Sequence, residues 1–181
     1  PVSPYGVSKL YSYWITKVYR NSYNIFASNG ILFNHESPHR GETFVTRKIT
    51  RGAVSIIKFN SKAIELGNLN SVRDWGHASD YCEAMYKIIT QKKSDDFVIS
   101  SDKVLSVRDF CIKVFNYLGL KIKFTGKKYN EKAIVVSSKK YPHLLNKTVI
   151  TVNKKYFRPL DLNYLRGDSS KARKVLKWKP K

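Results

Sequence analysis

The stretch IFASNGILFNHESPHRGET, residues 25–43, decides which fold the sequence predicts. Residues 25–33 form a mostly apolar run, and a polar loop follows directly, beginning at Asn34. A strand buried on both faces of a parallel sheet has this composition, and the carboxyl ends of such strands commonly open on a ligand site. The stretch therefore predicts a buried parallel strand with a functional site at its end.

Helical and strand patterns alternate on both sides of this stretch. Apolar residues recur at helical spacing in residues 4–20, 43–59, 74–91, 106–120 and 168–180, and short strand-like runs occupy residues 63–67, 95–101, 121–126 and 148–153. We expect Asp74 and Ser106 to begin their helices, Gly119 to stop the second of these, and Pro180 to end the last. The lysine-rich residues 126–147 are the best candidate for a mobile excursion. The alternation predicts an α/β fold with at least part of a parallel sheet.

The segment PYGVSK, residues 4–9, places a tyrosine four residues before a lysine. Of the three Tyr-x-x-x-Lys pairs in the chain, only Tyr5 and Lys9 follow a plausible helix start, with Ser3 as N-cap and Pro4 as first residue. A spacing of four puts both side chains on one helical face. The opposite face is expected to pack into the core; it carries Val7, Tyr11, Trp14 and Val18. Without further context, the pattern also fits an amphipathic helix with a surface tyrosine and lysine.

The chain is strongly basic, with 34 Lys and Arg against 13 Asp and Glu and a formal net charge of +21. Such a charge nominates a polyanion as partner. However, the lysines are scattered and no recognised nucleic-acid-binding motif accompanies them, so we do not expect nucleic acid to be the main partner. No long apolar run predicts a membrane span.

The cysteines and histidines predict neither a disulfide framework nor a metal site. Cys82 and Cys111 are too few for a disulfide scaffold, which favours a reducing, cytoplasmic setting. The spacing of the histidines predicts no metal site. The chain starts at Pro1 and its only methionine is Met85, so we expect the reading frame to extend upstream.

Seven segments of the chain resemble, in order, the carboxyl-terminal half of the GDP-mannose 4,6-dehydratases, a family of extended short-chain dehydrogenases/reductases. They are SPYGVSK (3–9), NGILFNHESPHRGETFVTRKIT (29–50), LGN (66–68), RDWGHASDYCEAMY (73–86), DDFVIS (95–100), YFRP (156–159) and GDSSKA (167–172). The second segment separates this family from other sugar-nucleotide enzymes. The resemblance implies a Rossmann-type parallel sheet plus a smaller sugar-nucleotide-binding lobe. Residues 1–35 would belong to the Rossmann domain and residues 36–181 mainly to the lobe, with about 74–100 returning to the sheet.

The resemblance also implies a chemistry, the NADP-dependent conversion of GDP-mannose to GDP-4-keto-6-deoxymannose. Tyr5 would be the catalytic base, and Lys9 would tune it and bind the cofactor ribose. A phenol is a poor base at neutral pH, but a neighbouring ammonium favours the phenolate. His35 and Arg40 would also contact NADP, Arg40 through phosphate, because a guanidinium forms bidentate hydrogen bonds to phosphate oxygens.

For the sugar nucleotide, the resemblance implies contacts from Asn34, Lys48, Arg73 and Arg158. Cations that converge on the two phosphates of a GDP-sugar would neutralise them as they become buried. For Lys48 the alternative of a solvated helix face is strong, because Arg47 and Arg51 lie nearby in the sequence. The family commonly forms dimers and tetramers, so a homo-oligomer is expected.

Parts of the family pattern are missing from these residues. No G-x-x-G-x-x-G phosphate-binding turn follows a first strand, and the family's catalytic threonine and glutamate, which precede the tyrosine, are absent. The chain on its own is therefore expected to hold half an active site and to be inactive. Two other functions stay open: a non-catalytic remnant that binds a nucleotide sugar, and a basic nucleic-acid-binding domain.

Overall fold

The computed structural model describes residues 1–157, 160 and 162–181, and the chain divides into two compact units. The first unit consists of residues 1–37, 73–104 and 164–181, and the second of residues 38–72 and 105–163. Each unit therefore combines segments that lie far apart in the sequence. In the structure, residues 164–181 belong to the first unit. The sequence analysis did not distinguish them from the rest of residues 36–181.

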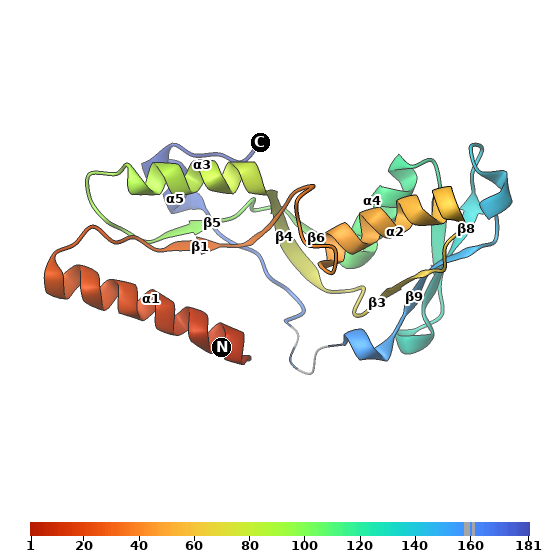
Figure 1. Ribbon diagram of the computed structural model, residues 1–181, viewed down its shortest axis with the longest axis horizontal. Helices are drawn as coiled ribbons and strands as arrows, with labels where there is room; N and C mark the ends of the chain where they lie inside the picture. Colours follow the sequence, from red (N-terminus) through yellow and green to blue (C-terminus); the bar gives the residue numbers. More distant parts are fainter. Residues whose placement is uncertain (158–159, 161) are drawn as a thin grey trace. The chain divides into compact units, whose positions relative to one another are not determined.

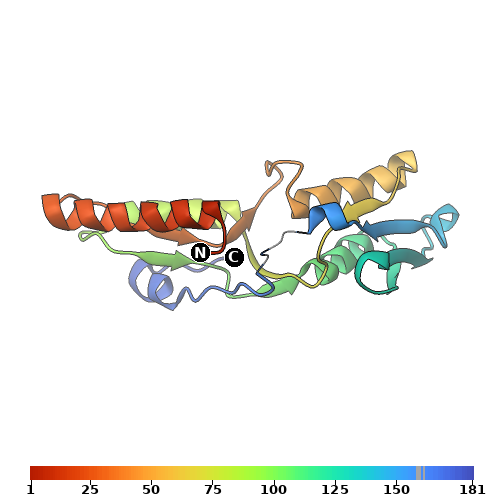
Figure 2. The same cartoon turned by 90° about the horizontal axis from the view of Figure 1, so that it is seen from below.

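Three helices flank a parallel strand pair in the first unit. The strands are β1 (Gly30–Leu32) and β5 (Phe97–Ile99), and they run in the same direction. Figure 1 shows α1 (Pro4–Tyr23) on one side of this pair, and α3 (Ala78–Ile89) and α5 (Ser170–Leu176) on the other. In the view from below, α1 lies in front of α3 (Figure 2), which agrees with this layering. The prediction of a parallel strand is confirmed for three of the nine residues, Gly30–Leu32. The prediction that this strand is buried is wrong, because Gly30 and Ile31 are exposed and Leu32 is only partly buried.

A second sheet begins directly after β1, with the strand order β2-β4-β6. It comprises β2 (Asn34–Glu36), β4 (Val72–His77) and β6 (Val104–Ser106), and β2 runs parallel to β4. The prediction that Asp74 begins a helix is wrong, because Asp74 lies inside β4 and is fully buried. The helix begins at Ala78, and His77 caps it by accepting a hydrogen bond from the backbone of Ser79.

The core of the first unit lies between α3, α5 and strand β5. It contains Tyr81, Ala84, Ile88, Phe97, Ile99, Ala172, Leu176 and Trp178. The last helix was expected to end at Pro180 but ends at Leu176, because Lys177 adopts a left-handed conformation (φ 51°). This turn directs Trp178 back into the core, where its indole N–H donates to the carbonyl of Asp80 at 2.8 Å.

The second unit is a four-stranded sheet with the order β3-β9-β8-β7, packed against α2 and α4 (Figure 1). Its helices are α2 (Val45–Phe59) and α4 (Val107–Tyr117), and its strands are β3 (Ile64–Leu66), β7 (Lys121–Thr125), β8 (Lys132–Ser137) and β9 (Thr148–Val152). Short 3-10 turns occupy Lys128–Asn130, Pro142–Leu144 and Lys154–Tyr156. Ser106 caps α4 as predicted, and α4 ends before Gly119.

The lysine-rich residues 126–147, expected to be a mobile excursion, contribute a strand to the sheet instead. They contain β8, which pairs antiparallel with both β7 and β9 and so lies inside the sheet. Lysines flank this strand and mask its pattern, whereas Ala133 and Val135 are fully buried.

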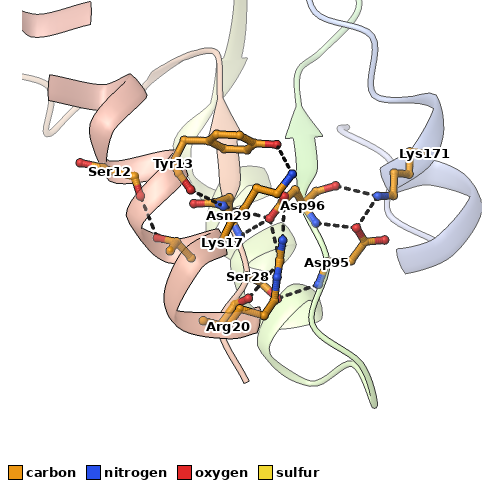
Figure 3. A network of polar contacts seen from close by, with 11 residues as sticks. Ser12, Tyr13, Lys17, Arg20, Ser28, Asn29, Asp95, Asp96 and Lys171 are labelled. Carbon is orange, nitrogen blue, oxygen red and sulfur yellow. Dashed lines mark hydrogen bonds and ion pairs between the residues drawn. The ribbon is translucent and has the colours of Figure 1, made fainter. Parts of the chain in front are cut away.

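Polar contacts, rather than apolar packing, hold α1 to its unit (Figure 3). Arg20 donates to both carboxylate oxygens of Asp96, at 2.9 and 3.0 Å, and Asn29 donates to the same carboxylate. The expectation that the face with Val7, Tyr11, Trp14 and Val18 packs into the core is wrong, because these side chains are 51–67% exposed. The face turned toward the unit instead carries Tyr13 and Arg20. Among the described residues, no helix has both the length and the apolarity needed to cross a bilayer.

The Arg20–Asp96 pair predicts an acid-sensitive contribution to stability. Burial alone raises the pKa of the Asp96 carboxyl, but hydrogen bonds from Arg20 and Asn29 outweigh it and lower that pKa to about 2. A carboxyl whose pKa is lower in the folded state stabilises the protein above its unfolded pKa and loses this contribution as the pH falls. We expect Asp96→Asn to cost on the order of 2 kcal/mol at pH 6, and the difference from wild type to vanish toward pH 2. Urea denaturation of both proteins across this range measures it, and a pH-independent difference would contradict the ion-pair assignment.

Candidate active site

Helix α1 presents Tyr5 and Lys9 on one exposed face of its first turns. The helix starts as predicted, with the Ser3 hydroxyl accepting a hydrogen bond from the backbone N–H of Gly6 at 3.0 Å and Pro4 as first residue. The Lys9 Nζ lies 5.4 Å from the centroid of the Tyr5 ring, and Tyr5 is 71% exposed. The spacing-based prediction that the two side chains are neighbours is confirmed. A phenol beside an ammonium can serve as an acid–base group for a bound ligand.

A second Tyr-x-x-x-Lys pair on the same helix is arranged differently. The Lys17 Nζ lies 3.5 Å from the Tyr13 hydroxyl and 4.9 Å from the centroid of the Trp14 ring. The backbone carbonyl of Tyr13 accepts a hydrogen bond from Asn29, so this pair lies on the side of α1 that is turned toward the rest of the unit (Figure 3). The helix therefore carries one exposed pair and one half-buried pair with the same spacing.

Strands β2 and β4 bring three predicted site residues into one sheet. Asn34 lies opposite Trp75 and His35 opposite Gly76 in the parallel register, and Arg73 belongs to the same strand β4. The Nδ1 atom of His35 is 2.8 Å from the carbonyl oxygen of Phe33. A carbonyl can only accept, so Nδ1 carries the proton and Nε2 of the neutral ring is left as an acceptor.

Tyr81 lies against His35 and was not among the residues predicted from the sequence. Its ring centroid is 4.9 Å from that of His35, with 30° between the planes, and the side chain is fully buried. Burial, assisted by nearby carboxylates such as Asp74, raises the pKa of Tyr81 well above its usual range, so its hydroxyl stays protonated. The helical spacing of Tyr81 with Ala84 and Ile88 indicates a core residue. Its contact with His35 depends on the pairing of β2 with β4, which the sequence pattern does not reveal.

In the second unit, Arg40 and Lys48 each lie over an aromatic ring. The Arg40 guanidinium carbon is 3.7 Å from the Phe44 ring centroid, and the Lys48 Nζ is 3.7 Å from the Tyr156 ring centroid. Such contacts contribute roughly 0.5–2 kcal/mol and restrict where the cation can lie. The alternative of a freely solvated Lys48 is therefore not what the structure shows. Tyr156 is a further residue that the sequence analysis did not single out.

Lys155 adds a second cation near the Tyr156 ring. Its Nζ is 4.9 Å from the centroid of Tyr156 and 2.9 Å from a carboxylate oxygen of Glu65. The hydrogen bond from Lys155, with another from Asn153, lowers the pKa of Glu65. Glu65 thus binds Lys155, while Lys48 lies on the Tyr156 ring.

The predicted site residues divide between the two units. Tyr5, Lys9, Asn34, His35 and Arg73 belong to the first unit, and Arg40 and Lys48 to the second. Arg158 lies outside the described residues. The described part of the chain contains no group of three or more His, Cys, Asp or Glu arranged to hold a metal ion.

Known proteins show the family to which this arrangement belongs. The family described as GDP-mannose 4,6 dehydratase matches residues 1–181. The GDP-mannose 4,6 dehydratase of Cricetulus griseus is 47% identical over 181 residues, which cover 100% of this chain and 47% of that protein. The GDP-mannose 4,6-dehydratase of Vibrio cholerae serotype O1 is 48% identical over 183 residues, covering 99% of this chain and 49% of that protein. The chain thus spans about half the length of the curated relatives it matches.

Solved structures share the fold at low sequence identity. The dTDP-glucose 4,6-dehydratase from Bacillus anthracis in complex with NAD has a TM-score of 0.75 at 18% identity, covering 100% of this chain and 48% of that one. RMD from Pseudomonas aeruginosa complexed with NADPH has a TM-score of 0.75 at 15% identity, covering 100% of this chain and 51% of that one. These likenesses agree with a Rossmann-type α/β fold. The match over the whole chain shows that it belongs to the GDP-mannose 4,6-dehydratase family.

Proposed function

We propose that the chain supplies the carboxyl-terminal half of an NADP-dependent GDP-mannose 4,6-dehydratase, a hydro-lyase that forms GDP-4-keto-6-deoxymannose. The observation that carries this proposal is the exposed Tyr5–Lys9 pair on the capped first turns of α1, in a chain of this family. The first unit would belong to the Rossmann domain and the second to the sugar-nucleotide lobe. A homo-oligomer is part of the proposal, as is a cytoplasmic setting, which the free thiols of Cys82 and Cys111 fit.

The chemistry of the available side chains fits a nicotinamide dinucleotide. His35 offers Nε2 as an acceptor for an amide or hydroxyl proton, and Arg40 offers a guanidinium suited to phosphate. The Bacillus anthracis dehydratase was solved with NAD and the Pseudomonas aeruginosa protein with NADPH. NADP, when bound, supplies the hydride chemistry that this reaction class requires. We assign its contacts to Tyr5, Lys9, His35 and Arg40.

In this proposal, Tyr5 moves the proton at the sugar. Its phenolate takes the proton from the C4 hydroxyl as that carbon is oxidised, and Lys9 lies beside the Tyr5 ring. The exposed position of both residues on α1 lets a ligand reach them. General base catalysis of this kind contributes about 10²–10⁴-fold to a rate.

We assign the recognition of GDP-mannose to Asn34, Lys48, Arg73 and Arg158. Two phosphate charges need cationic partners once they are removed from water. Lys48 is held on the Tyr156 ring, which limits the rotamer entropy it would lose when a phosphate binds.

The experiment that tests the function uses an assembled enzyme, which we define as this chain joined to the part of the Cricetulus griseus relative that it does not match. We expect the assembled enzyme to form a 4-keto sugar from GDP-mannose in the presence of NADP, and the 181 residues alone to form none. An assembled enzyme that folds and binds GDP-mannose without turnover would favour a non-catalytic remnant. Activity of the 181 residues alone would contradict the proposed division of the site.

Arg158 provides a test of the substrate-binding assignment. A charged hydrogen bond to phosphate is worth about 1.5–3 kcal/mol, so Arg158→Ala should weaken GDP and GDP-mannose binding by roughly 10–150-fold. Both ligands should lose equally, because they share the diphosphate. Calorimetric titration of the assembled enzyme measures this, with the exposed Arg166 changed to Ala as a matched control. An unchanged GDP affinity would contradict the phosphate contact and favour the alternative that Arg158 is an ordinary surface charge.

A further inference from the structure

Tyr81 has a feature that its core position does not explain. The side chain is fully buried, yet its hydroxyl has no hydrogen-bond partner among the described residues. An unpaired buried hydroxyl costs about 1–3 kcal/mol, and phenylalanine would avoid that cost in an apolar core. The role of Tyr81 therefore lies in its ring and in the groups that the ring contacts.

The ring of Tyr81 occupies the space left by a missing side chain. Gly76 lies directly opposite His35 in the register of β2 and β4, so a side chain at Gly76 would stand beside the imidazole. A Cβ atom at Gly76 would lie 2.3 Å from Cε2 and 2.9 Å from the hydroxyl of Tyr81. The glycine is required because the tyrosine ring fills this position.

The Tyr81 ring contacts two other aromatic groups. Its centroid lies 4.9 Å from that of the His35 ring, with 30° between the planes, and 6.2 Å from that of Trp178, which it meets edge-on at 86°. Trp178 is itself fixed by its hydrogen bond to the carbonyl of Asp80. The Tyr81 ring cannot withdraw from His35 without disturbing this core, so it forms a rigid wall for the imidazole.

We propose that Tyr81 is a positioning residue that holds the imidazole of His35 in one orientation and one tautomer. The Phe33 carbonyl selects the proton on Nδ1, and the ring of Tyr81 blocks the rotation that would break this hydrogen bond. Nε2 is then presented as a fixed acceptor. The inference rests on the proposed function in that the ligand of Nε2 is the nicotinamide cofactor.

Two substitutions separate the ring from its hydroxyl. Tyr81→Phe keeps the ring and removes only the unpaired hydroxyl, so His35 should be unaffected and stability unchanged or higher. Tyr81→Leu keeps an apolar side chain but removes the aromatic ring that lies against His35. Gly76→Ala retains Tyr81 but places a Cβ atom where its ring lies. The ring should therefore move and displace His35 as well, and this variant serves if Tyr81→Leu fails to fold.

The first measurement needs no cofactor. Isotope-labelled histidine in the 181-residue chain gives ring-nitrogen NMR signals for four residues, and His39, His77 and His143 are internal references. We expect His35 to show a single tautomer with the proton on Nδ1 in wild type and Tyr81→Phe, and averaged tautomers in Tyr81→Leu and Gly76→Ala. An unaltered His35 signal in both disruptive variants would overturn the proposal, as would an averaged signal in Tyr81→Phe.

The second measurement uses the assembled enzyme. Tyr81→Leu should raise KM for NADP about tenfold while kcat changes less than about twofold, and Tyr81→Phe should restore the wild-type KM. If the tautomer responds to Tyr81 but addition of NADP leaves the His35 signal unmoved, the positioning role stands and the cofactor assignment of His35 fails. A fall in kcat with KM unchanged would contradict positioning through His35.

Discussion

Replacing Tyr5 with Phe in the assembled enzyme is expected to lower kcat about a hundredfold or more, with little change in GDP-mannose affinity. The substitution removes the only acid–base group of this side chain and keeps its ring. Because Tyr5 is 71% exposed, its loss should leave the packing of α1 intact. The Arg20–Asp96 pair and the Ser3 cap hold the helix independently of the phenol. Steady-state kinetics, with GDP-mannose affinity from calorimetry, measure the effect.

The half-buried pair on the same helix provides the matched control. Tyr13→Phe removes a hydroxyl with the same spacing to a lysine, here Lys17 at 3.5 Å, but Tyr13 is half-buried and its backbone carbonyl, which the substitution keeps, accepts from Asn29. We expect turnover to stay within about threefold of wild type. Near-normal turnover of Tyr5→Phe would contradict the assignment of Tyr5 as the catalytic base. A large loss of turnover in Tyr13→Phe would favour Tyr13 and Lys17 as the catalytic pair instead.

Much of the fold follows from local signals that the structure bears out. Ser3 and Ser106 cap their helices through hydroxyl hydrogen bonds, as their positions before helical patterns predict. The strands β3, β5, β7 and β9 all lie inside runs recognised by composition. These elements were predictable because the residues that specify them are adjacent in the sequence.

The errors arise where distant contacts override local signals. Asp74 looks like a helix cap, but its carboxylate is buried by segments far along the chain. The strand β8 was not predicted because lysines surround it and obscure the strand pattern. Its pairing with both β7 and β9, which its composition does not indicate, makes it part of the sheet. The apolar face of α1 led to a prediction of burial, yet the partly buried Arg20–Asp96 ion pair holds the opposite, more polar face.

The candidate site shows the same division. Helical spacing alone predicts that the side chains of Tyr5 and Lys9 lie next to each other, and the structure confirms this prediction. The stacking of Tyr81 on His35 requires β2 to pair with β4 in one register, and the contact of Lys48 with Tyr156 joins residues more than a hundred positions apart. No local pattern encodes such contacts.

Replacing Asp74 with Ala should cost about 3 kcal/mol or more of folding stability, the largest loss that we expect from a single polar substitution here. The carboxylate is fully buried and accepts from the Ser101 N–H at 2.8 Å, the Ser101 hydroxyl at 2.7 Å and the Gly167 N–H at 3.4 Å. These bonds tie β4 to two segments that follow much later in the chain. The substitution leaves buried donors without their acceptor and opens a small cavity.

The hydrogen bond from the Gly167 N–H to Asp74 depends on a glycine at position 167. A Cβ atom at Gly167 would lie 2.3 Å from the Cβ of Ser100, so the backbone reaches Asp74 only because the glycine has no side chain. Urea denaturation of the assembled enzyme measures the loss. The exposed Asp168, which accepts from the Ser170 N–H at 2.9 Å, is the control, and Asp168→Ala should cost far less than Asp74→Ala. Equal losses for Asp74→Ala and Asp168→Ala would mean that the buried carboxylate does not hold the strand that carries Arg73 and Gly76.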